Sequence, residues 1–347
     1  MLDFDPNSAP DEDSGVFGLP HQEKDSKLVL LPVPWEATTS YGGGTSDGPK
    51  AILEASGQID LFDGEVNKPY EPGIFMLPES KEVRAWNKKA KASAQKIIAK
   101  GGRIDGNKKL AAELRNVNAL SEKLNDWVYR ETLRLMNQGK IVGLVGGDHS
   151  VPLGAFKAAA EKHGGFGLLH FDAHSDTRDA YEGFVHSHAS IMRNALDSIP
   201  SITRLTQVGI RDYCEQEQEY LDAQGGRAKV FFDRDLARAR FEGKPWAKTV
   251  EEIVASLPSQ VWITFDIDGL DPQLCPSTGT PVPGGLQLAE ATYLIAQVAR
   301  SGRTILGFDL VEVAPGETEW DANVAMRLLY KLCAWTMVTR GLRKARE

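Results

Sequence analysis

Three clusters of Asp and His side chains follow short apolar runs, and their types and spacing suggest metal chemistry. The run 168–171 leads into Asp172, His174 and Asp176. Alternate side chains of an extended chain point the same way, so these three can project together from the end of a buried strand. Three potential ligands that converge in this way are typical of a metal site.

Two further segments repeat this pattern. The apolar run 142–147 leads into His149, and the run 263–265 ends in Asp266 with Asp268 two residues later. Carboxylates and imidazoles without thiolates suit divalent ions such as Mn²⁺, while imidazole also admits Zn²⁺, Fe²⁺, Co²⁺ or Ni²⁺. Because six ligands exceed what one closed zinc site needs, we predict a two-metal centre with ions about 3.5 Å apart and shared carboxylates. The predicted ligands are His149, Asp172, His174, Asp176, Asp266 and Asp268.

The elements that must position these residues alternate between strands and helices. This alternation predicts an α/β fold, a three-layer α/β/α sandwich with a central, mainly parallel sheet. In such sheets ligands bind beyond the carboxyl ends of the strands, where all six candidates fall. The predicted strands are 27–34, 141–146, 166–172, 205–210, 228–232, 260–266 and 304–311. The predicted helices are 110–137, 151–162, 188–197, 215–223, 246–257, 286–301 and 320–340. A further helix is predicted to begin at Pro49 and to continue through Ile52, Leu53 and Ser56.

The domain organisation is predicted to be simple. Residues 1–27 are polar and read as an N-terminal arm, and 28–347 read as a single domain. Segment 62–108 contains three prolines that break any long element, so we interpret it as an insertion that carries an amphipathic helix. Three glycines at 42–44 predict a structural turn, because no Gly-Lys-Ser/Thr follows as in a phosphate loop.

Composition narrows the class of function. The formal net charge of −8 argues against nucleic acid as a partner and mildly favours a small cationic substrate. Cys214, Cys275 and Cys333 are odd in number and widely spaced, which suits a reducing compartment. No signal peptide and no run near ~18 apolar residues is present, so we expect a cytoplasmic protein with no membrane partner.

Four sequence blocks carry a resemblance to a known family. They are Gly146-Gly147-Asp148-His149-Ser150 and the stretches 170–176, 264–285 and 307–315. In order and spacing they resemble the ureohydrolases, which include arginase, agmatinase and formiminoglutamase. The resemblance spans 141–315 and implies hydrolysis of a guanidino C–N bond to urea and an amine.

The resemblance also implies roles for individual residues. Asp172 and Asp266 would bridge the two ions, with Mn²⁺ favoured and Ni²⁺ the alternative. Asp176 would orient the attacking water, and Glu312 would pair with the substrate guanidinium. One ion would be held by His149, Asp172, Asp176 and Asp266, and the other by Asp172, His174, Asp266 and Asp268. Members of the family assemble as trimers or hexamers, so a homo-trimer or homo-hexamer is implied.

The stretch 176–190 bears on the substrate. His188 matches the mobile histidine of the family, a proton shuttle to the leaving amine, and it would also bind substrate. Arg178 stands where arginases have asparagine, and Cys214 stands where arginases use an acidic side chain to recognise the substrate α-amino group. The pattern looks like a bacterial agmatinase, which would place the protein in polyamine metabolism with agmatine as substrate.

Alternatives stay open at this point. If Arg178 faces the cavity, it would bind a carboxylate, as in 4-guanidinobutyrate or formiminoglutamate; otherwise it is a salt-bridged surface residue. Free guanidine and alkylguanidines are further candidates. The last alternative is that the protein is a family member without catalytic activity, acting as a subunit.

Overall fold

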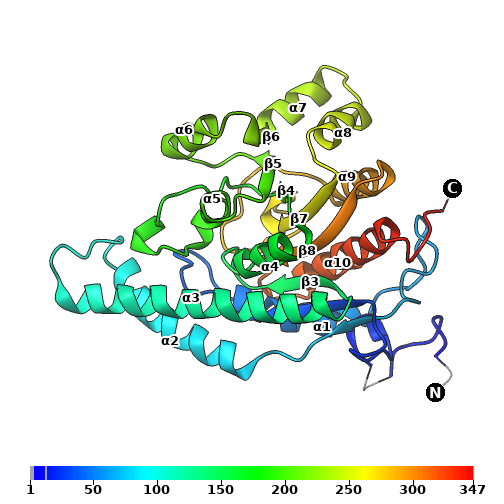
Figure 1. Ribbon diagram of the computed structural model, residues 1–347, viewed down its shortest axis with the longest axis horizontal. Helices are drawn as coiled ribbons and strands as arrows, with labels where there is room; N and C mark the ends of the chain where they lie inside the picture. The colour runs from blue at the N-terminus through cyan, green and yellow to red at the C-terminus, as the bar shows by residue number, and fades with distance from the viewer. Residues whose placement is uncertain (1–3, 12–13, 347) are drawn as a thin grey trace.

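The computed structural model describes residues 4–11 and 14–346, and its centre is a sheet of eight parallel strands (Figure 1). The strand order is β2-β1-β3-β8-β7-β4-β5-β6, and every neighbouring pair is parallel. The strands are β1 (Leu28–Val33), β2 (Ile74–Met76), β3 (Ile141–Gly146), β4 (Phe166–Phe171), β5 (Ile202–Ile210), β6 (Ala228–Phe232), β7 (Gln260–Asp266) and β8 (Thr304–Val311). The predicted parallel sheet is confirmed.

Helices cover both faces of this sheet, which confirms the three-layer α/β/α sandwich. They are α1 (Gly48–Ser56), α2 (Lys81–Ile98), α3 (Lys108–Asn137), α4 (Leu153–His163), α5 (Ile191–Ser198), α6 (Glu215–Ala223), α7 (Asp233–Phe241), α8 (Trp246–Ala255), α9 (Leu288–Arg300) and α10 (Trp320–Thr339). One apolar core joins the sheet to α2, α3, α4 and α5, and the other joins it to α1, α8, α9 and α10. Figure 1 shows the long α3 running along one side of the molecule with α2 beside it.

The apolar character of the strands follows from this double cover. In β1, Leu28 and Leu30 pack into one core, whereas Val29 and Leu31 pack into the other, and all four are buried. A strand that is buried on both faces needs a continuous apolar run and not an alternation of apolar and polar residues. The central strands therefore carry their polar residues mainly at their carboxyl ends.

Segment 62–108 contributes β2 and α2 to the sandwich. β2 pairs with β1 at one edge of the sheet, and α2 packs against α3. The isolated antiparallel bridge between Val66 and Ala345 also ties this segment to the C-terminal end of the chain. Within the polar arm, Val16, Phe17 and Leu19 are buried in the core. The division into arm, domain and insertion remains a prediction.

Two elements were not predicted, namely the edge strand β2 and the charged helix α7. Helix 188–197 begins as a single 3₁₀ turn at His188–Ser190 before α5. Among the described residues, no helix is long and apolar enough to cross a membrane.

Gly147 generates a testable prediction, because it connects β3 to His149. A Cβ at this position would lie 1.8 Å from the Trp35 carbonyl oxygen, so even a methyl group forces backbone to move. We expect Gly147→Ala to destabilise the fold by about 3 kcal/mol or more, measured by denaturant unfolding. Gly226→Ala is the matched control, since nothing lies within 4 Å of its Cβ position. Equal midpoints for the two variants would contradict this packing.

Candidate metal centre and active-site cavity

Four neighbouring strands of the sheet deliver the predicted ligands to one place. In the sheet they stand in the order β3, β8, β7 and β4, so their carboxyl ends lie side by side. His149 follows β3, Glu312 follows β8, Asp266 ends β7 and Asp172 follows β4. The ends of parallel strands form a common edge at which side chains from distant parts of the sequence meet.

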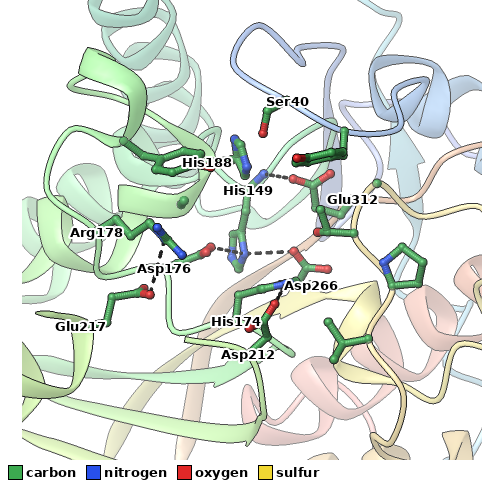
Figure 2. A pocket seen from close by; sticks show the side chains of 17 residues that line it. Ser40, His149, His174, Asp176, Arg178, His188, Asp212, Glu217, Asp266 and Glu312 are labelled. Carbon is green, nitrogen blue, oxygen red and sulfur yellow. Dashed lines mark hydrogen bonds and ion pairs between the residues drawn. The ribbon is translucent and has the colours of Figure 1, made fainter. Parts of the chain in front are cut away.

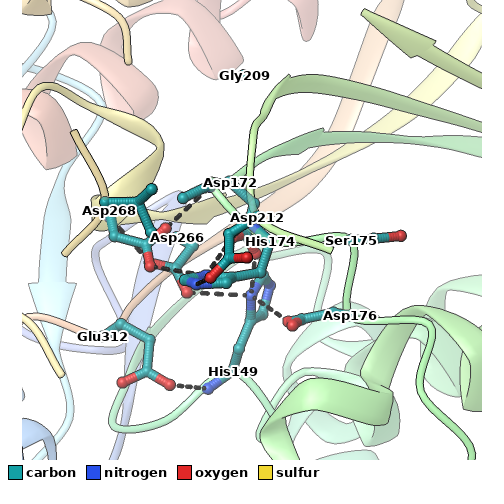
Figure 3. A network of polar contacts seen from close by, with 12 residues as sticks. His149, Asp172, His174, Ser175, Asp176, Gly209, Asp212, Asp266, Asp268 and Glu312 are labelled. Atoms are coloured by element: carbon teal, nitrogen blue, oxygen red, sulfur yellow. Dashed lines mark hydrogen bonds and ion pairs between the residues drawn. The ribbon is translucent and has the colours of Figure 1, made fainter. Parts of the chain in front are cut away.

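Asp172 lies between the predicted ligand histidines (Figure 3). Its Oδ2 is 3.0 Å from His149 Nδ1, and its Oδ1 is 3.4 Å from His174 Nδ1. His149 Nδ1 also lies 3.2 Å from Asp176 Oδ2 and 3.3 Å from Asp266 Oδ2. One imidazole nitrogen therefore faces three carboxylates from two different strands.

His174 forms the second half of the cluster with Asp268. His174 Nδ1 is 3.0 Å from Asp268 Oδ2, and the Ala173 amide donates to Asp268 Oδ1 at 3.0 Å. Two buried groups have the ligand types and the proximity to hold a metal ion, and they share Asp172. They are His149, His170, Asp172 and Asp176, and Asp172, His174 and Asp268.

The crowded carboxylates of this cluster favour the binding of cations. Burial and then the charge of Asp172 raise the pKa of Asp176 to about 7. Burial, followed by the charges of Asp268 and Asp172, raises the pKa of Asp266 well above its ordinary value. Carboxylates that are buried this close together disfavour ionisation unless positive charge is supplied. The donor set fits two divalent ions, and it does not distinguish Mn²⁺ from Ni²⁺.

Two site residues have a strained backbone. Asp176 has φ 56° and Glu312 has φ 61°, both in the left-handed region that side-chain-bearing residues rarely adopt. The surrounding structure must stabilise such conformations, which cost of order 1–3 kcal/mol each and cluster at functional sites. At both positions the chain leaves the sheet and turns a carboxylate toward the cavity (Figure 2).

Glu312 is held by the same turn that carries His149. The His149 amide donates to Glu312 Oε1 at 2.9 Å, and the Glu312 amide donates to the Gly147 carbonyl at 2.7 Å. Burial and then the charge of Asp148 raise the pKa of Glu312 well above its ordinary value. A cationic ligand in the cavity would offset that cost.

His188 lies at the cavity wall and is oriented by Thr38. The Thr38 hydroxyl accepts from the His188 amide at 3.2 Å and lies 3.1 Å from its Nδ1. If the same hydroxyl donates to Nδ1, the neutral ring carries its proton on Nε2. Burial, and then the nearby His174 and His149, lower the pKa of His188 to about 4. The imidazole is therefore neutral at neutral pH.

Arg178, which from the sequence could face either the cavity or the surface, is one of the residues that line the cavity. Its Nε is 3.5 Å from Glu217 Oε2, and its guanidinium lies 4.8 Å from the Tyr181 ring centroid. Glu217 is buried, and its carboxylate accepts hydrogen bonds from the backbone amides of Thr177 at 3.1 Å and Cys214 at 3.0 Å. Arg178 is thus both cavity-facing and paired with a carboxylate.

Several residues of the site were not predicted. His170 Nε2 lies 2.8 Å from Asp172 Oδ2, and Gln207 contacts the other ring nitrogen at 2.9 Å. His170 precedes Asp172 by two positions on β4, so strand alternation could have identified it. Thr38 and Glu217 come from a loop and a helix start whose sequences give no such signal.

Asp309 is the acceptor of a hydrogen-bonded chain behind the cluster. Thr264 Oγ1 lies 2.9 Å from His149 Nε2 and donates to Asp309 Oδ1 at 2.8 Å. Trp262 Nε1 donates to Asp309 Oδ2 at 2.7 Å. This chain fixes the His149 ring with its Nδ1 toward the carboxylates, as second contacts of metal ligands commonly do.

This sheet and its His/Asp cluster define a hydrolase of the arginase fold. The model of the Arginase family matches residues 26–334, and the chain belongs to that family of ureohydrolases, which act on linear amidines. The chain is 32% identical to N(1)-aminopropylagmatine ureohydrolase of Thermus thermophilus, covering 91% of this chain and 92% of the relative. It is 29% identical to proclavaminate amidinohydrolase of Streptomyces clavuligerus, and the match covers 86% of this chain and 84% of that relative. The crystal structure of agmatine ureohydrolase of Thermoplasma volcanium superposes with a TM-score of 0.69 at 24% sequence identity. The superposition covers 93% of this chain and 94% of that structure.

The metal centre yields a prediction that needs no substrate. We expect about two divalent ions per purified chain after loading with Mn²⁺, and one or fewer after Asp268→Asn, measured by elemental analysis. Chelation should also lower the thermal midpoint of the wild type, because an ion that binds only the folded chain stabilises it by about 4 kcal/mol at 1,000 times Kd.

Asp271→Asn is the matched control for this substitution. Asp271 follows Asp268 by three residues, but its carboxylate accepts from Gln273 and Gln287 and not from the cluster. This variant should keep the wild-type metal content. If Asp268→Asn also kept it, the assignment of Asp268 as a ligand would be wrong.

Proposed function

We propose that the protein is a dinuclear-metal amidinohydrolase that cleaves agmatine to putrescine and urea. One observation carries the proposal. Glu312 lines the same cavity as His149, His174, Asp176 and Asp266, and the His149 amide holds its carboxylate. A carboxylate beside a metal cluster can bind a guanidinium and present its carbon for attack.

The proposed chemistry divides among few groups. Two divalent ions, when bound, would activate a water as the nucleophile near neutral pH. Glu312 would hold the guanidinium through paired hydrogen bonds, and Asp176 would accept a hydrogen bond from the attacking water. A C–O bond forms, the C–N bond to the alkyl chain breaks, and urea and the amine leave. His188 is neutral at rest, so it would first accept the proton that the attacking water releases and would then, as the imidazolium, pass a proton to the departing nitrogen.

Cavity charge supports a substrate with a cationic tail. Glu217 opposes the charge of Arg178, whereas Asp212 lines the cavity with a carboxylate side chain that is 69% exposed. Asp212 Oδ2 is 3.9 Å from His174 Nε2, which places it beside the predicted metal ligands. Pro281 and Val282 supply apolar wall for an alkyl chain. The volume of about 360 Å³ is sufficient for a small extended substrate.

A second substrate class is favoured by the orientation of Arg178. Its guanidinium faces the cavity over Tyr181, and among the described residues one carboxylate, that of Glu217, pairs with it. A substrate with a carboxylate tail, such as 4-guanidinobutyrate or formiminoglutamate, could compete for it.

Urea release by the Mn²⁺- and Ni²⁺-loaded protein tests the proposal. The panel is agmatine, N(1)-aminopropylagmatine, 4-guanidinobutyrate, arginine, methylguanidine and guanidine, and formiminoglutamate is assayed separately for the release of formamide, because a formimino group cannot yield urea. We expect the highest kcat/KM with agmatine and no release by Asp172→Asn, which removes the shared carboxylate. Mn²⁺ is expected to support more activity than Ni²⁺. If none of these compounds released urea, a non-catalytic role for the protein would be favoured.

The oligomeric state, a homo-trimer or a homo-hexamer, remains a prediction, and light scattering would measure it.

Arg178→Met separates the two substrate classes. If agmatine is the substrate, the loss of a positive charge should leave kcat/KM for agmatine equal or higher. If a carboxylate tail is bound, kcat/KM for 4-guanidinobutyrate should fall by about tenfold. Arg193→Met is the control, since that arginine pairs with Asp179 and Asp197 outside the cavity. A similar loss in both variants would indicate a general effect on folding.

A further inference from the structure

The loop between β1 and α1 forms one wall of the active-site cavity. We define it as residues 34–47. Ser40 and Tyr41 line the cavity, and Thr38 contacts His188. Figure 2 shows Ser40 extending toward the cavity from this loop. The position of the loop therefore affects both the space for a substrate and the orientation of His188.

Apart from the 3₁₀ turn at Thr45–Asp47, the loop contains no regular element. Gly42, Gly43 and Gly44 all have positive φ, at 64°, 130° and 102°. Gly42 packs closely on another wall of the cavity, because a Cβ there would lie 2.9 Å from the Cα and the carbonyl oxygen of Gly279. Three consecutive glycines have high conformational entropy when unrestrained, so something else must fix the loop.

Glu36 closes the loop on itself. Its carboxylate is buried, and Oε2 accepts from the Gly44 amide at 2.6 Å, the Ser46 amide at 3.3 Å and the Thr45 hydroxyl at 3.3 Å. One oxygen atom thus joins the start of the loop to its end. The segment between them carries Thr38, Ser40 and Tyr41.

Helix α2 anchors Glu36 from outside the cavity. Lys91 Nζ donates to Glu36 Oε1, and Asn87 Oδ1 accepts the Glu36 amide at 2.9 Å. Asn87 and Lys91 are four residues apart, so both lie on one face of α2. Burial opposes the ionisation of Glu36, yet the hydrogen bond and charge of Lys91 hold its pKa below the ordinary value. Without Lys91 the buried carboxylate would have no cationic partner, which is strongly destabilising.

We propose that Lys91 and Asn87 are positioning residues, which act through Glu36 to fix loop 34–47 over the active-site cavity. Neither side chain lines the cavity. α2 would then help to set the affinity for substrate and the orientation of His188, a statement that rests on the proposed function. Its structural part, the fastening of the loop by α2, stands apart from the identity of the substrate.

Hydrogen exchange measured by mass spectrometry on the full-length, metal-loaded protein tests the fastening directly. In Lys91→Met, we expect peptides that cover 38–47 to exchange at least tenfold faster than in the wild type, because the Gly44 and Ser46 amides lose a fixed acceptor. Peptides of β3 and β4 should be unchanged. Lys91→Arg should restore slow exchange, since its guanidinium can still donate to Glu36. Asn87→Ala, which removes the other tether, should speed exchange in the same peptides.

Lys89→Met is the matched control, because Lys89 is exposed on the same helix. Wild-type exchange of 38–47 in both Lys91→Met and Asn87→Ala would overturn the proposal, as would equal acceleration in Lys89→Met. For the best substrate of the panel, KM should rise about tenfold in Lys91→Met with metal content unchanged. If the wild type hydrolyses no guanidine, the proposed function fails, and the exchange experiment still decides whether α2 fastens the loop.

Discussion

Four aspartates buried at the ends of β4 and β7 repel one another, and the rest of the site is arranged around that repulsion. Asp172 stays ionised because, although burial opposes its charge, neighbouring histidines hold its pKa well below the ordinary value. Asp176 and Asp266 have raised pKa values instead. A protein gains nothing in stability from crowding acids in this way unless cations bind. The cluster is therefore best understood as a cation site that the fold maintains at a cost.

The topology of the sheet is what makes this crowding possible. The four strands that supply the site are third, fourth, seventh and eighth along the chain, yet they are adjacent in the sheet. Chain order predicts that each polar group follows a strand, but it does not predict which strands are neighbours. The predicted meeting of His149, Asp172 and Asp266 rested on the general rule for parallel sheets and on the family resemblance. In the structure these side chains meet because β3 pairs with β8, β8 with β7 and β7 with β4.

The elements that were missed lacked the signals that prediction needs. Strands 141–146, 228–232, 260–266 and 304–311 were predicted with the bounds observed, because continuous apolar runs are unambiguous when helices flank them. β2 has only three residues, and α7 buries a single apolar side chain, Leu236, so it has no apolar periodicity. In the site, the ligand types were readable from the sequence. Thr38 and Glu217 were not, because tertiary contacts alone bring a loop threonine and a helix-start glutamate to the cavity.

His149 belongs to two networks at once. Its ring faces the carboxylates, whereas its main-chain amide holds Glu312. A displacement of the ring that also shifted the main chain at His149 would shift the Glu312 carboxylate with it. Occupancy of the cluster and the position of that carboxylate would then be linked, and the coupling free energy would be the same in both directions. Two side chains that are 163 residues apart in the chain thus share one backbone hinge point.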